Sequence, residues 1–342
     1  MLWPLSQIYR LIMDLRNFLY DHSILKITKL PIPVIAVGNI TLGGTGKTPL
    51  VIALSSFLES KGFKVGVVTR GYRRKSKGQV VVKDGKAVLA SPSDAGDEPY
   101  LIACKSGNIV VIADANRVEA ARSAIKKYHC NVLIADDAFQ HRALARNIDI
   151  VLWDSYSNPA KAAVIPAGRL RESWRGLRRA DILLITRSAE ISDPIRSFFQ
   201  KKQPDLFIDV LPLSIGKIIH YNSGEEIAPE MIRNKKVLGF CGLGNPVQFF
   251  NTIGYLNPAS ITENIFPDHH KYSEGDVDSL VRESVEKGCD YLITTEKDAM
   301  NFPASVKTIT NLLILQISSD LSKKIKAAII QKLPPVSDKF IG

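Results

Sequence analysis

A glycine-rich turn after an apolar run is the first feature of this 342-residue chain with a recognisable chemistry. Residues 34–48 read VIAVGNITLGGTGKT, which predicts a strand, a tight turn and the start of a helix. Backbone N–H groups of such a turn, together with the partly positive helix N-terminus, can surround the oxygens of a polyphosphate. We therefore expect a nucleoside triphosphate to be bound by Thr41, Leu42, Gly43, Gly44, Thr45, Gly46, Lys47 and Thr48.

Two side chains at the end of this turn have distinct expected roles. Lys47 would reach the β- and γ-phosphates and assist catalysis by neutralising charge during phosphoryl transfer. The hydroxyl of Thr48 can bind Mg²⁺. Thr41 replaces the first glycine of the usual phosphate-loop pattern, so the match covers only the second half of that pattern.

Adjacent carboxylates end a second apolar run, in residues 130–141, CNVLIADDAFQH. In a phosphate-loop fold, an acidic residue at the end of a neighbouring strand lies beside the metal, so Asp136 and Asp137 are expected to bind Mg²⁺ directly or through water. A helix N-cap would explain one of these carboxylates but not both. Gln140 and His141 stand on the next turn and could position the substrate.

A third acidic segment precedes a helical run. Residues 93–103 read SDAGDEPYLIA, with Asp97 and Glu98 directly before a proline. Acidic residues are favoured in the first turn of a helix, which leaves a purely structural role open. A transferase with a hydroxyl acceptor also needs a group that takes the proton, and Asp97 could be that general base, with Glu98 as a substrate contact.

The C-terminal third contains two further polar segments. In residues 266–272, FPDHHKY, the adjacent histidines point in different directions, so a shared metal site is not favoured. His269 or His270 could instead assist a carboxylate or contact phosphate, and a solvated loop is the alternative. Lys297 and Asp298 follow an apolar run, which leaves a base or ribose contact open.

The charge balance indicates an anionic partner. The formal net charge is +11 at pH 7, and nucleic acid, an anionic membrane surface or a phosphorylated substrate could each match it. Arginine forks fit phosphate oxygens, and Arg70 and Arg171 are the expected substrate contacts. The arginine clusters around them lack the interleaved aromatic side chains of single-stranded nucleic-acid sites, so no nucleic-acid partner is expected. Nothing in the sequence indicates an obligate protein partner.

The N-terminus has the pattern of an amphipathic helix. Gln7, Arg10, Asp14 and Asn17 fall away from its apolar face. Such a helix can lie in a membrane interface or pack on the protein's own core, and the opening Met-Leu-Trp and the basic balance favour the membrane. No segment is long and apolar enough to span a bilayer. The apolar face contains Trp3, Leu5, Ile8, Leu11, Ile12, Leu15, Phe18 and Leu19.

Apolar runs alternate with helical stretches along the rest of the chain. This order predicts an α/β fold of the phosphate-loop NTPase type, with a mostly parallel sheet flanked by helices. Residues 79–90 predict an inserted hairpin. The four cysteines lack CxxC spacing, which favours a reducing compartment over a zinc site or disulfides. Expected strands are Val34–Val37, Val65–Thr69, Ile109–Ile112, Val132–Ala135, Ile148–Trp153, Ile182–Ile185, Lys236–Phe240, Tyr291–Thr294 and Leu312–Leu315.

A change of pattern near residues 215–227, IGKIIHYNSGEEI, predicts a second hairpin with Asn222, Ser223 and Gly224 as its turn. We place the boundary between two domains here. The expected organisation is an amphipathic helix over 1–28, a phosphate-loop domain over 29–212, a two-stranded linker over 213–230 and a smaller α/β domain over 231–342.

These segments together resemble the tetraacyldisaccharide 4'-kinase family of the lipid A pathway in Gram-negative bacteria. The resemblance implies ATP- and Mg²⁺-dependent phosphorylation of the 4'-hydroxyl of a tetraacylated disaccharide 1-phosphate, at the cytoplasmic face of the inner membrane. It also implies two α/β domains with the active site between them. The segments that carry it are VGNITLGGTGKTP, VVTRGYRRKSKG, GDEPYLIA, DDAFQHRAL, IPAGRLRES, FCGLGNP, FPDHHKY and TTEKDA.

The resemblance also implies roles for individual side chains. Asp97 is similar to the family's catalytic base, and His269 to the histidine that assists it, with His270 as the alternative. Lys47 and Thr48 would serve the nucleotide and metal, beside the Asp136 and Asp137 metal site.

Two other function classes share some of these features. A membrane-associated phosphate-loop ATPase switch or metallochaperone would also have GGTGKT and an amphipathic helix. That class has a lysine before the glycine pair, where this chain has Leu42, and it does not need the GDEP and DHH segments. A nucleic-acid-binding ATPase would rest on the basic balance alone.

Overall fold

The chain folds into two units in the computed structural model, which describes residues 2–303, 306 and 309–333. Unit 2 spans Ser214–Ser318, and unit 1 comprises the described residues on either side of it. The smaller domain was expected over 231–342, so unit 2 begins and ends earlier than predicted. The chain returns to unit 1 after Ser318. There, α10 (Lys323–Lys332) buries Ile325 and Ile329 in the unit 1 core.

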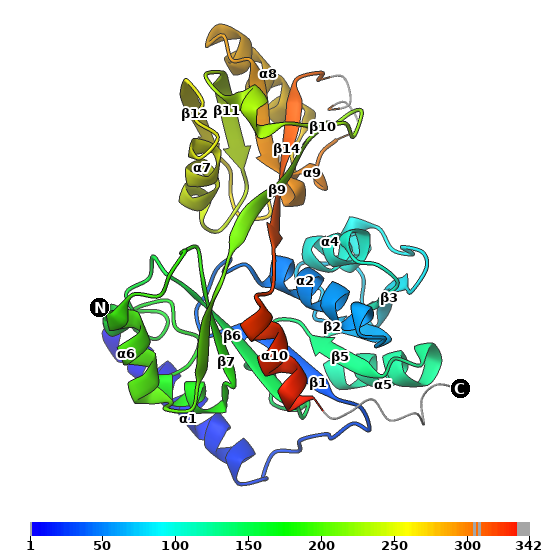
Figure 1. Ribbon diagram of the computed structural model, residues 1–342, viewed down its shortest axis with the longest axis vertical. Coiled ribbons are helices and arrows are strands. Elements are labelled where there is room, and N and C mark those ends of the chain that lie inside the picture. The colour runs from blue at the N-terminus through cyan, green and yellow to red at the C-terminus, as the bar shows by residue number, and fades with distance from the viewer. Residues whose placement is uncertain (1, 304–305, 307–308, 334–342) are drawn as a thin grey trace. The chain divides into compact units, whose positions relative to one another are not determined.

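Unit 1 is built on an eight-stranded sheet with the order β3-β4-β2-β5-β1-β6-β7-β8 (Figure 1). Every neighbouring pair is parallel except β3 and β4. Most of its strands are buried along their whole length, as expected for short apolar runs covered on both faces. The strands are β1 (Val34–Asn39), β2 (Val65–Thr69), β3 (Val80–Asp84), β4 (Val110–Ala113), β5 (Val132–Ala135), β6 (Ile148–Asp154), β7 (Ile182–Thr186) and β8 (Phe207–Leu211).

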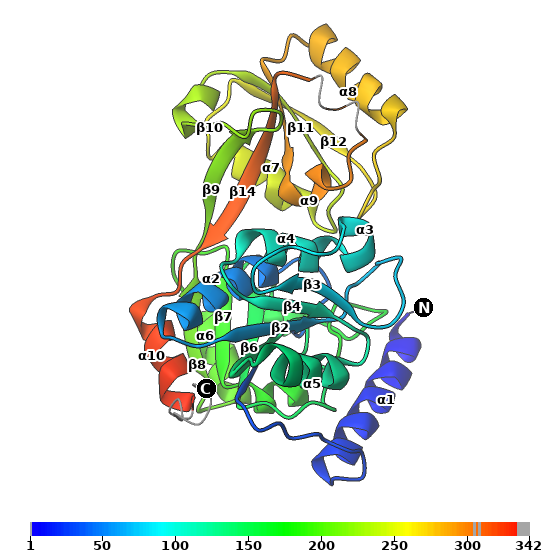
Figure 2. The ribbon, with the colours of Figure 1, turned by 90° about the vertical axis from the view of Figure 1, so that its right-hand side faces the viewer.

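Helices cover both faces of this sheet and make a three-layer unit (Figure 2). On one face, α2 (Lys47–Ser60) and α4 (Asp97–Lys105) share a core with α10. On the other face lie α5 (Arg117–Tyr128) and α6 (Asp193–Lys202). The loops that leave the carboxyl ends of the parallel strands therefore meet at one edge, which is where such folds bind ligands. Shorter elements are α3 (Pro92–Ala95), η1 (Pro159–Lys161) and η2 (Trp174–Arg179).

The expected strands of unit 1 are confirmed within one or two residues at each end. The hairpin expected over 79–90 is only partly formed, because β3 pairs with β4 in the main sheet and its return arm is a single bridge between Lys83 and Val88. The helix expected over 1–28 is shorter than predicted. It is α1 (Trp3–Asp21), which ends where Ser23 adopts a left-handed φ of 58°.

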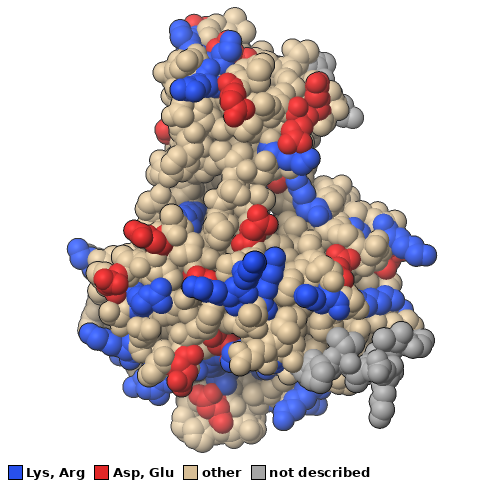
Figure 3. All heavy atoms as spheres, in the orientation of Figure 1, with Lys and Arg blue, Asp and Glu red and all other residues tan. Residues whose placement is uncertain are grey.

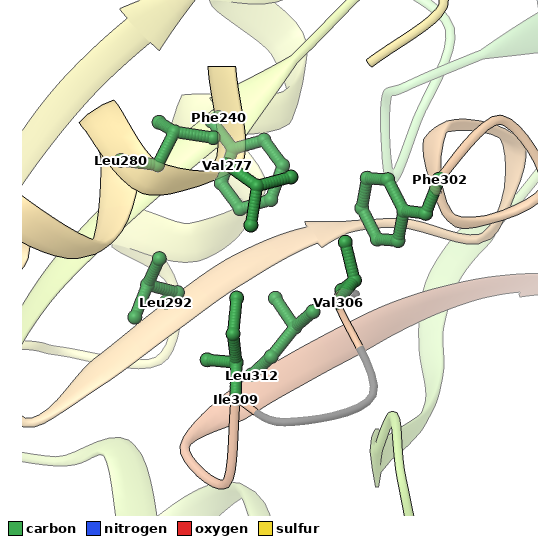
Figure 4. Close-up of a pocket in the computed structure, with 8 residues that line it drawn as sticks. All are labelled: Phe240, Val277, Leu280, Leu292, Phe302, Val306, Ile309 and Leu312. Atoms are coloured by element: carbon green, nitrogen blue, oxygen red, sulfur yellow. The ribbon is translucent and has the colours of Figure 1, made fainter. Parts of the chain in front are cut away.

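Unit 2 has a six-stranded sheet with the order β10-β9-β14-β13-β11-β12. The predicted hairpin around Gly224 is confirmed as β9 and β10, and it is part of this sheet. Apolar side chains of α7 and α8 lie in two separate clusters of the unit 2 core, and Figure 4 shows a pocket beside α8 that is lined entirely by apolar side chains. The elements are β9 (Leu213–His220), β10 (Glu226–Ile227), η3 (Pro229–Ile232), β11 (Lys236–Cys241), α7 (Pro246–Gly254), β12 (Ser260–Ile265), α8 (Glu274–Glu286), β13 (Tyr291–Thr295), α9 (Glu296–Ala299) and β14 (Leu312–Ser319).

Candidate active site

The glycine-rich turn joins the central strand β1 to α2, as the sequence predicts. Gly43 and Gly46 have φ values of 107° and 89°, in the left-handed region that favours glycine. The Asn39 side-chain amide donates hydrogen bonds to the Gly43 carbonyl at 3.2 Å and to Thr45 Oγ1 at 3.1 Å. The side chains of Thr41 and Thr45 are buried, so these two residues can offer a phosphate only their backbone groups.

Two other segments brace this phosphate loop. Leu42 and Arg169 exchange hydrogen bonds, from Leu42 N to the Arg169 carbonyl at 2.7 Å and from Arg169 Nη2 to the Leu42 carbonyl at 2.9 Å. Arg187, after β7, donates from Nη2 to the Gly44 carbonyl at 2.6 Å and pairs through Nη1 with Asp154 at 2.5 Å. Arg187 was not predicted as a contact of this loop, because no local motif surrounds it.

Asp137 is paired with two cations beside the loop. Its Oδ1 lies 3.5 Å from Lys47 Nζ and 2.8 Å from Arg171 Nη1. Burial opposes ionisation of Asp137, but the two cations outweigh it and hold the pKa of this carboxyl below its usual value. The structure therefore brings together three of the residues that the sequence singled out, from three separate segments.

Asp136 is the more deeply buried of the two carboxylates, with 2% of its surface exposed. It accepts a hydrogen bond from Thr69 Oγ1 at 3.1 Å. Burial, followed by the nearby charges of Glu98 and Asp137, raises the pKa of Asp136 to about 7. Glu98 therefore lies close enough to Asp136 for the two negative charges to repel each other. Asp97, which is half-buried, begins α4 directly before Glu98.

Arg117 was missed as a site residue. It is the first residue of α5, and its Nη2 donates to the backbone carbonyl of Asp137 at 3.0 Å. It is 5% exposed, and burial lowers its pKa. The nearby carboxylates of Asp137 and Asp136 act in the opposite direction and raise the pKa, but burial outweighs them. The charges of Arg70 and Arg171 also act on it, so the three arginines share one neighbourhood. Its place after β4, at the same edge of the sheet, is the signal that could have revealed it.

Gln140 and His141 follow the carboxylates in the same site. Gln140 Nε2 donates to the Asn39 carbonyl at 3.1 Å and to Glu172 Oε1 at 3.0 Å. Burial, with the positive charges of Arg117 and Arg146 next in effect, lowers the pKa of His141 to about 4. Its imidazole is therefore neutral at physiological pH, and its buried Nε2 has no hydrogen-bond partner among the described residues.

The two adjacent histidines of unit 2 have different surroundings. His269 adopts a left-handed φ of 59°, and its Nε2 lies 3.1 Å from Lys297 Nζ and 3.9 Å from Asp268 Oδ2. His270 Nε2 lies 3.1 Å from Asp276 Oδ2, and its ring stacks on Phe266 with centroids 4.7 Å apart. His270 therefore has a structural role at the start of α8.

Asp298, for which the sequence left a base or ribose contact open, is an internal structural group of unit 2. It is 2% exposed. Its Oδ1 accepts from Gly242 N at 2.8 Å and Tyr272 Oη at 3.0 Å, and its Oδ2 accepts from Thr295 Oγ1 at 2.6 Å. Both carboxylate oxygens are thus already engaged within the unit.

The comparisons with known proteins identify the family. The family described as tetraacyldisaccharide-1-P 4'-kinase (LpxK) matches residues 1–334. The chain belongs to this family. It is 37% identical to the tetraacyldisaccharide 4'-kinase of Chlorobaculum tepidum over 304 residues, which cover 87% of this chain and 85% of that protein. The corresponding kinase of Pelodictyon phaeoclathratiforme is 33% identical, with 97% of each chain covered.

A solved member of the LpxK family has the same fold. The crystal structure of LpxK from Aquifex aeolicus in complex with ATP is 32% identical to this chain, with a TM-score of 0.74. The match covers 97% of this chain and 98% of that one. The chain is therefore an ATP-dependent kinase that phosphorylates tetraacyldisaccharide 1-phosphate in lipid A biosynthesis, and the ATPase-switch and nucleic-acid alternatives are set aside.

The residues of this LpxK family member fit a magnesium ion of the kind that kinases use. Across residues 2–303, 306 and 309–333, no three His, Cys, Asp or Glu side chains form a ready-made metal cage. Mg²⁺ in phosphotransferases is bound by one or two carboxylates together with substrate phosphates and water. The crowding of Asp136 by Asp137 and Glu98 provides negative charge that a cation would neutralise.

Proposed function

We propose that unit 1 binds Mg²⁺·ATP at the phosphate loop, with Lys47 and Thr48 toward the phosphates and Asp136 and Asp137 toward the metal. The observation that carries this proposal is the contact of Lys47 Nζ with Asp137 Oδ1 at 3.5 Å, at the end of the turn. The bound cation would supply polarisation of the phosphoryl oxygens and charge neutralisation. Lys47 would supply a second fixed positive charge as the phosphoryl group is transferred.

Asp97 is the proposed general base. It stands in the first turn of α4, one residue before Glu98, whose charge acts on Asp136. A carboxylate at this position can accept the proton of the acceptor 4'-hydroxyl as that oxygen bonds to phosphorus and ADP leaves. Glu98, Gln140, His141, Arg70 and Arg171 are the proposed contacts for the substrate, and Arg117 joins them because it shares the neighbourhood of Arg70 and Arg171.

His269 is proposed as the assisting histidine. His270 already pairs with Asp276 and stacks on Phe266. His269 lies instead beside Lys297 and Asp268, in a local group of ionisable side chains. This assignment applies the family resemblance to the histidine whose contacts are with Lys297 and Asp268 and not with the start of α8.

We propose that α1 attaches the kinase to an anionic membrane surface, at the cytoplasmic face of the inner membrane. The support is that α1 turns its apolar side outward, with Trp3 67%, Leu11 62% and Leu15 59% exposed. No helix within the described ranges is long and apolar enough to cross a bilayer. Figure 3 shows Lys and Arg side chains, with Asp and Glu among them, on the α10 side of unit 1, so the charge that supports attachment is the net charge of +11.

Transfer of labelled γ-phosphate from ATP to tetraacyldisaccharide 1-phosphate in detergent tests the proposed site. We expect labelled lipid with the wild type, and none above background with Lys47→Ala or Asp97→Asn. Asp97→Asn should still bind ATP, because the base acts on the acceptor. ATP hydrolysis without lipid labelling would overturn the kinase assignment, and full turnover by Asp97→Asn would overturn the base assignment.

Vesicle co-sedimentation tests the attachment. The variant Leu11→Asp, Leu15→Asp should lose binding to vesicles that contain anionic lipid. The double variant Val247→Asp, Val285→Asp, at apolar positions of unit 2 that are 62% and 75% exposed, adds the same charge. It is the matched control and should bind like the wild type. Equal binding by all three proteins would contradict the proposed role of α1.

A further inference from the structure

The side of α1 opposite its apolar face is hydrogen-bonded into unit 1. Ser6 Oγ donates to the Val164 carbonyl at 2.5 Å, and Asp14 Oδ1 accepts from Ser173 Oγ at 2.5 Å. Arg142 Nη1 donates to the Asn17 carbonyl at 2.8 Å. These contacts join α1 to the segments near residues 140 and 170, which also flank the phosphate loop.

A further contact of α1, made by the Asn17 side chain, begins a hydrogen-bonded connection to the phosphate loop. Asn17 Nδ2 donates to Glu172 Oε2 at 2.9 Å, and Glu172 Oε1 accepts from Gln140 Nε2 at 3.0 Å. Gln140 Nε2 also donates to the Asn39 carbonyl, and the Asn39 amide holds Gly43 and Thr45 of the loop. Asn17 of α1 is therefore connected to the loop through the side chains of Glu172 and Gln140 and then through Asn39.

The centre of this connection is fully buried, and its oxygens are held by several donors. Glu172 is 0% exposed, and both of its carboxylate oxygens accept from Arg179 Nη2, at 2.9 and 3.0 Å. Gly176 packs so closely that an added Cβ would lie 2.3 Å from Glu172 Oε2. A buried carboxylate held in this way loses much if a donor is removed, because an unpaired buried oxygen is costly.

A second link joins α1 to the metal side of the site. Tyr9 Oη donates to the Arg171 carbonyl at 3.1 Å, and Arg16 donates to the Gln140 carbonyl. The side chain of Arg171 contacts Asp137 at 2.8 Å and Gln140 Oε1 at 3.5 Å. The docking of α1 thus acts on both Gln140 and Arg171, the two residues that connect the phosphate loop to Asp137.

We propose that Asn17 is a positioning residue for phosphoryl transfer, so that α1 organises the active site as well as facing the membrane. The inference rests on the kinase activity and on the proposed site around Asp137. Without the Asn17 donor, Glu172 Oε2 keeps only Arg179 as a donor, so the carboxylate would shift toward Arg179 and loosen its contact with Gln140. The phosphate loop and Arg171 would then lose a shared support. Displacements of about 1 Å at such sites cost up to about a hundredfold in rate.

The test is steady-state kinetics of lipid phosphorylation in detergent with Asn17→Asp, which places a second acceptor against Glu172. We expect kcat to fall about tenfold to a hundredfold with little change in the KM for lipid. Gln7→Glu adds the same charge to the same helix, at a residue with no side-chain hydrogen bond among those described, and should keep the wild-type kcat. In the double variant Asn17→Asp, Glu172→Gln, the amide nitrogen can face the new carboxylate while the remaining oxygen accepts from Gln140 and Arg179, so part of the loss should be recovered.

Thermal midpoints and vesicle co-sedimentation separate positioning from anchoring, because a pure anchor would change binding and leave kcat in detergent unaltered. Should Asn17→Asp fail to fold, Asn17→Ala removes the donor without adding charge and serves in its place. An unchanged kcat, an equal loss in Gln7→Glu, or no recovery in the double variant would each overturn the proposal. A wild type that transfers no phosphate would instead count against the kinase function itself.

Discussion

Lys47 and Asp137 form an ion pair at the end of the phosphate loop, with Nζ 3.5 Å from Oδ1. The lysine that would neutralise transferring phosphate is thus held by the carboxylate that would bind the metal. Arg171 contacts the same oxygen at 2.8 Å, so Asp137 remains paired when Lys47 is engaged elsewhere. This arrangement keeps both ends of the proposed site charged and oriented before any ligand enters.

Removal of the Lys47 charge should therefore act mainly on the chemical step. We expect Lys47→Met to lower kcat by about a hundredfold or more, because a fixed charge near the transferring group is lost. Lys61→Met, just after the other end of α2, is the control and should match the wild type. Single-turnover kinetics with saturating ATP would measure the effect, and equal rates for both variants would contradict it.

Asp136 should make the ligand-free protein less stable as the pH rises. Its folded-state pKa of about 7 lies above its ordinary value of 3.8, so the native state binds the extra proton between these pH values. Stability is therefore fully present below about pH 4 and is lost as the pH rises toward 7. At pH 8 we expect Asp136→Asn to be about 2–4 kcal/mol more stable than the wild type, although inactive.

Chemical denaturation at pH 4.5 and pH 8 would measure this difference. Asp84→Asn is the control with the opposite sign, because backbone N–H groups of Ala87 and Lys86 lower the pKa of Asp84. It should be no more stable than the wild type at pH 8. If Asp136→Asn gained the same stability at both pH values, the ionisation argument would be wrong.

The sequence predicted the elements of unit 1 well, because buried parallel strands are short apolar runs that can be read locally. Contacts between segments that are distant in the sequence were harder to predict. The residues after Ser318 looked like the end of the second domain, but they pack Ile325 and Ile329 into unit 1. Strand β8 was not predicted either, since the charged residue Asp209 interrupts its apolar run.

Residues of the candidate site were predicted where they stand in a local motif. They were missed where only the tertiary structure brings them to the site. Lys47, Asp136 and Asp137 stand in recognisable segments, and the structure brings them together. Arg117 and Arg187 have no such local pattern, and each reaches the site because its strand ends at the same edge of the sheet. The spacing of residues in the sequence does not show which strands end beside one another unless the strand order is known.

His141 should take no part in the pH dependence of catalysis above pH 5. Burial and neighbouring arginines lower its pKa to about 4, so its imidazole stays neutral there. The native state loses stability as the pH falls from 6.5 toward 4, because only the unfolded chain is protonated in that window. We expect His141→Gln to remove roughly 1–3 kcal/mol of this acid destabilisation. Urea unfolding at pH 4.5 and pH 7.5 would measure the stability that each protein loses on acidification. An equal loss in His141→Gln and the wild type would contradict the lowered pKa of His141.

The two histidines of the 266–272 segment should separate into a functional and a structural residue. His270→Ala removes the contact with Asp276 and the stacking on Phe266, so we expect about 1–2 kcal/mol lower stability and nearly normal kcat. His269→Ala should lower kcat with little loss of stability. Paired measurement of unfolding midpoints and kcat would check both, and the reverse pattern would exchange the two assignments.

Asp298 should be essential to the folding of unit 2 rather than to nucleotide recognition. Asp298→Ala leaves the donors of Gly242, Tyr272 and Thr295 without their acceptor, at an expected cost of about 2–4 kcal/mol. Asp298→Asn retains one side-chain oxygen as an acceptor. It also removes a carboxyl group whose pKa is raised by burial, so it should lower the stability less than Asp298→Ala does. Urea unfolding can be followed by a fluorophore attached at Val285→Cys in a protein that also carries Cys104→Ser and Cys289→Ser. The label then reports on unit 2. Equal stability of the alanine variant and the wild type, or a selective loss of ATP affinity in a fully folded variant, would contradict the structural role.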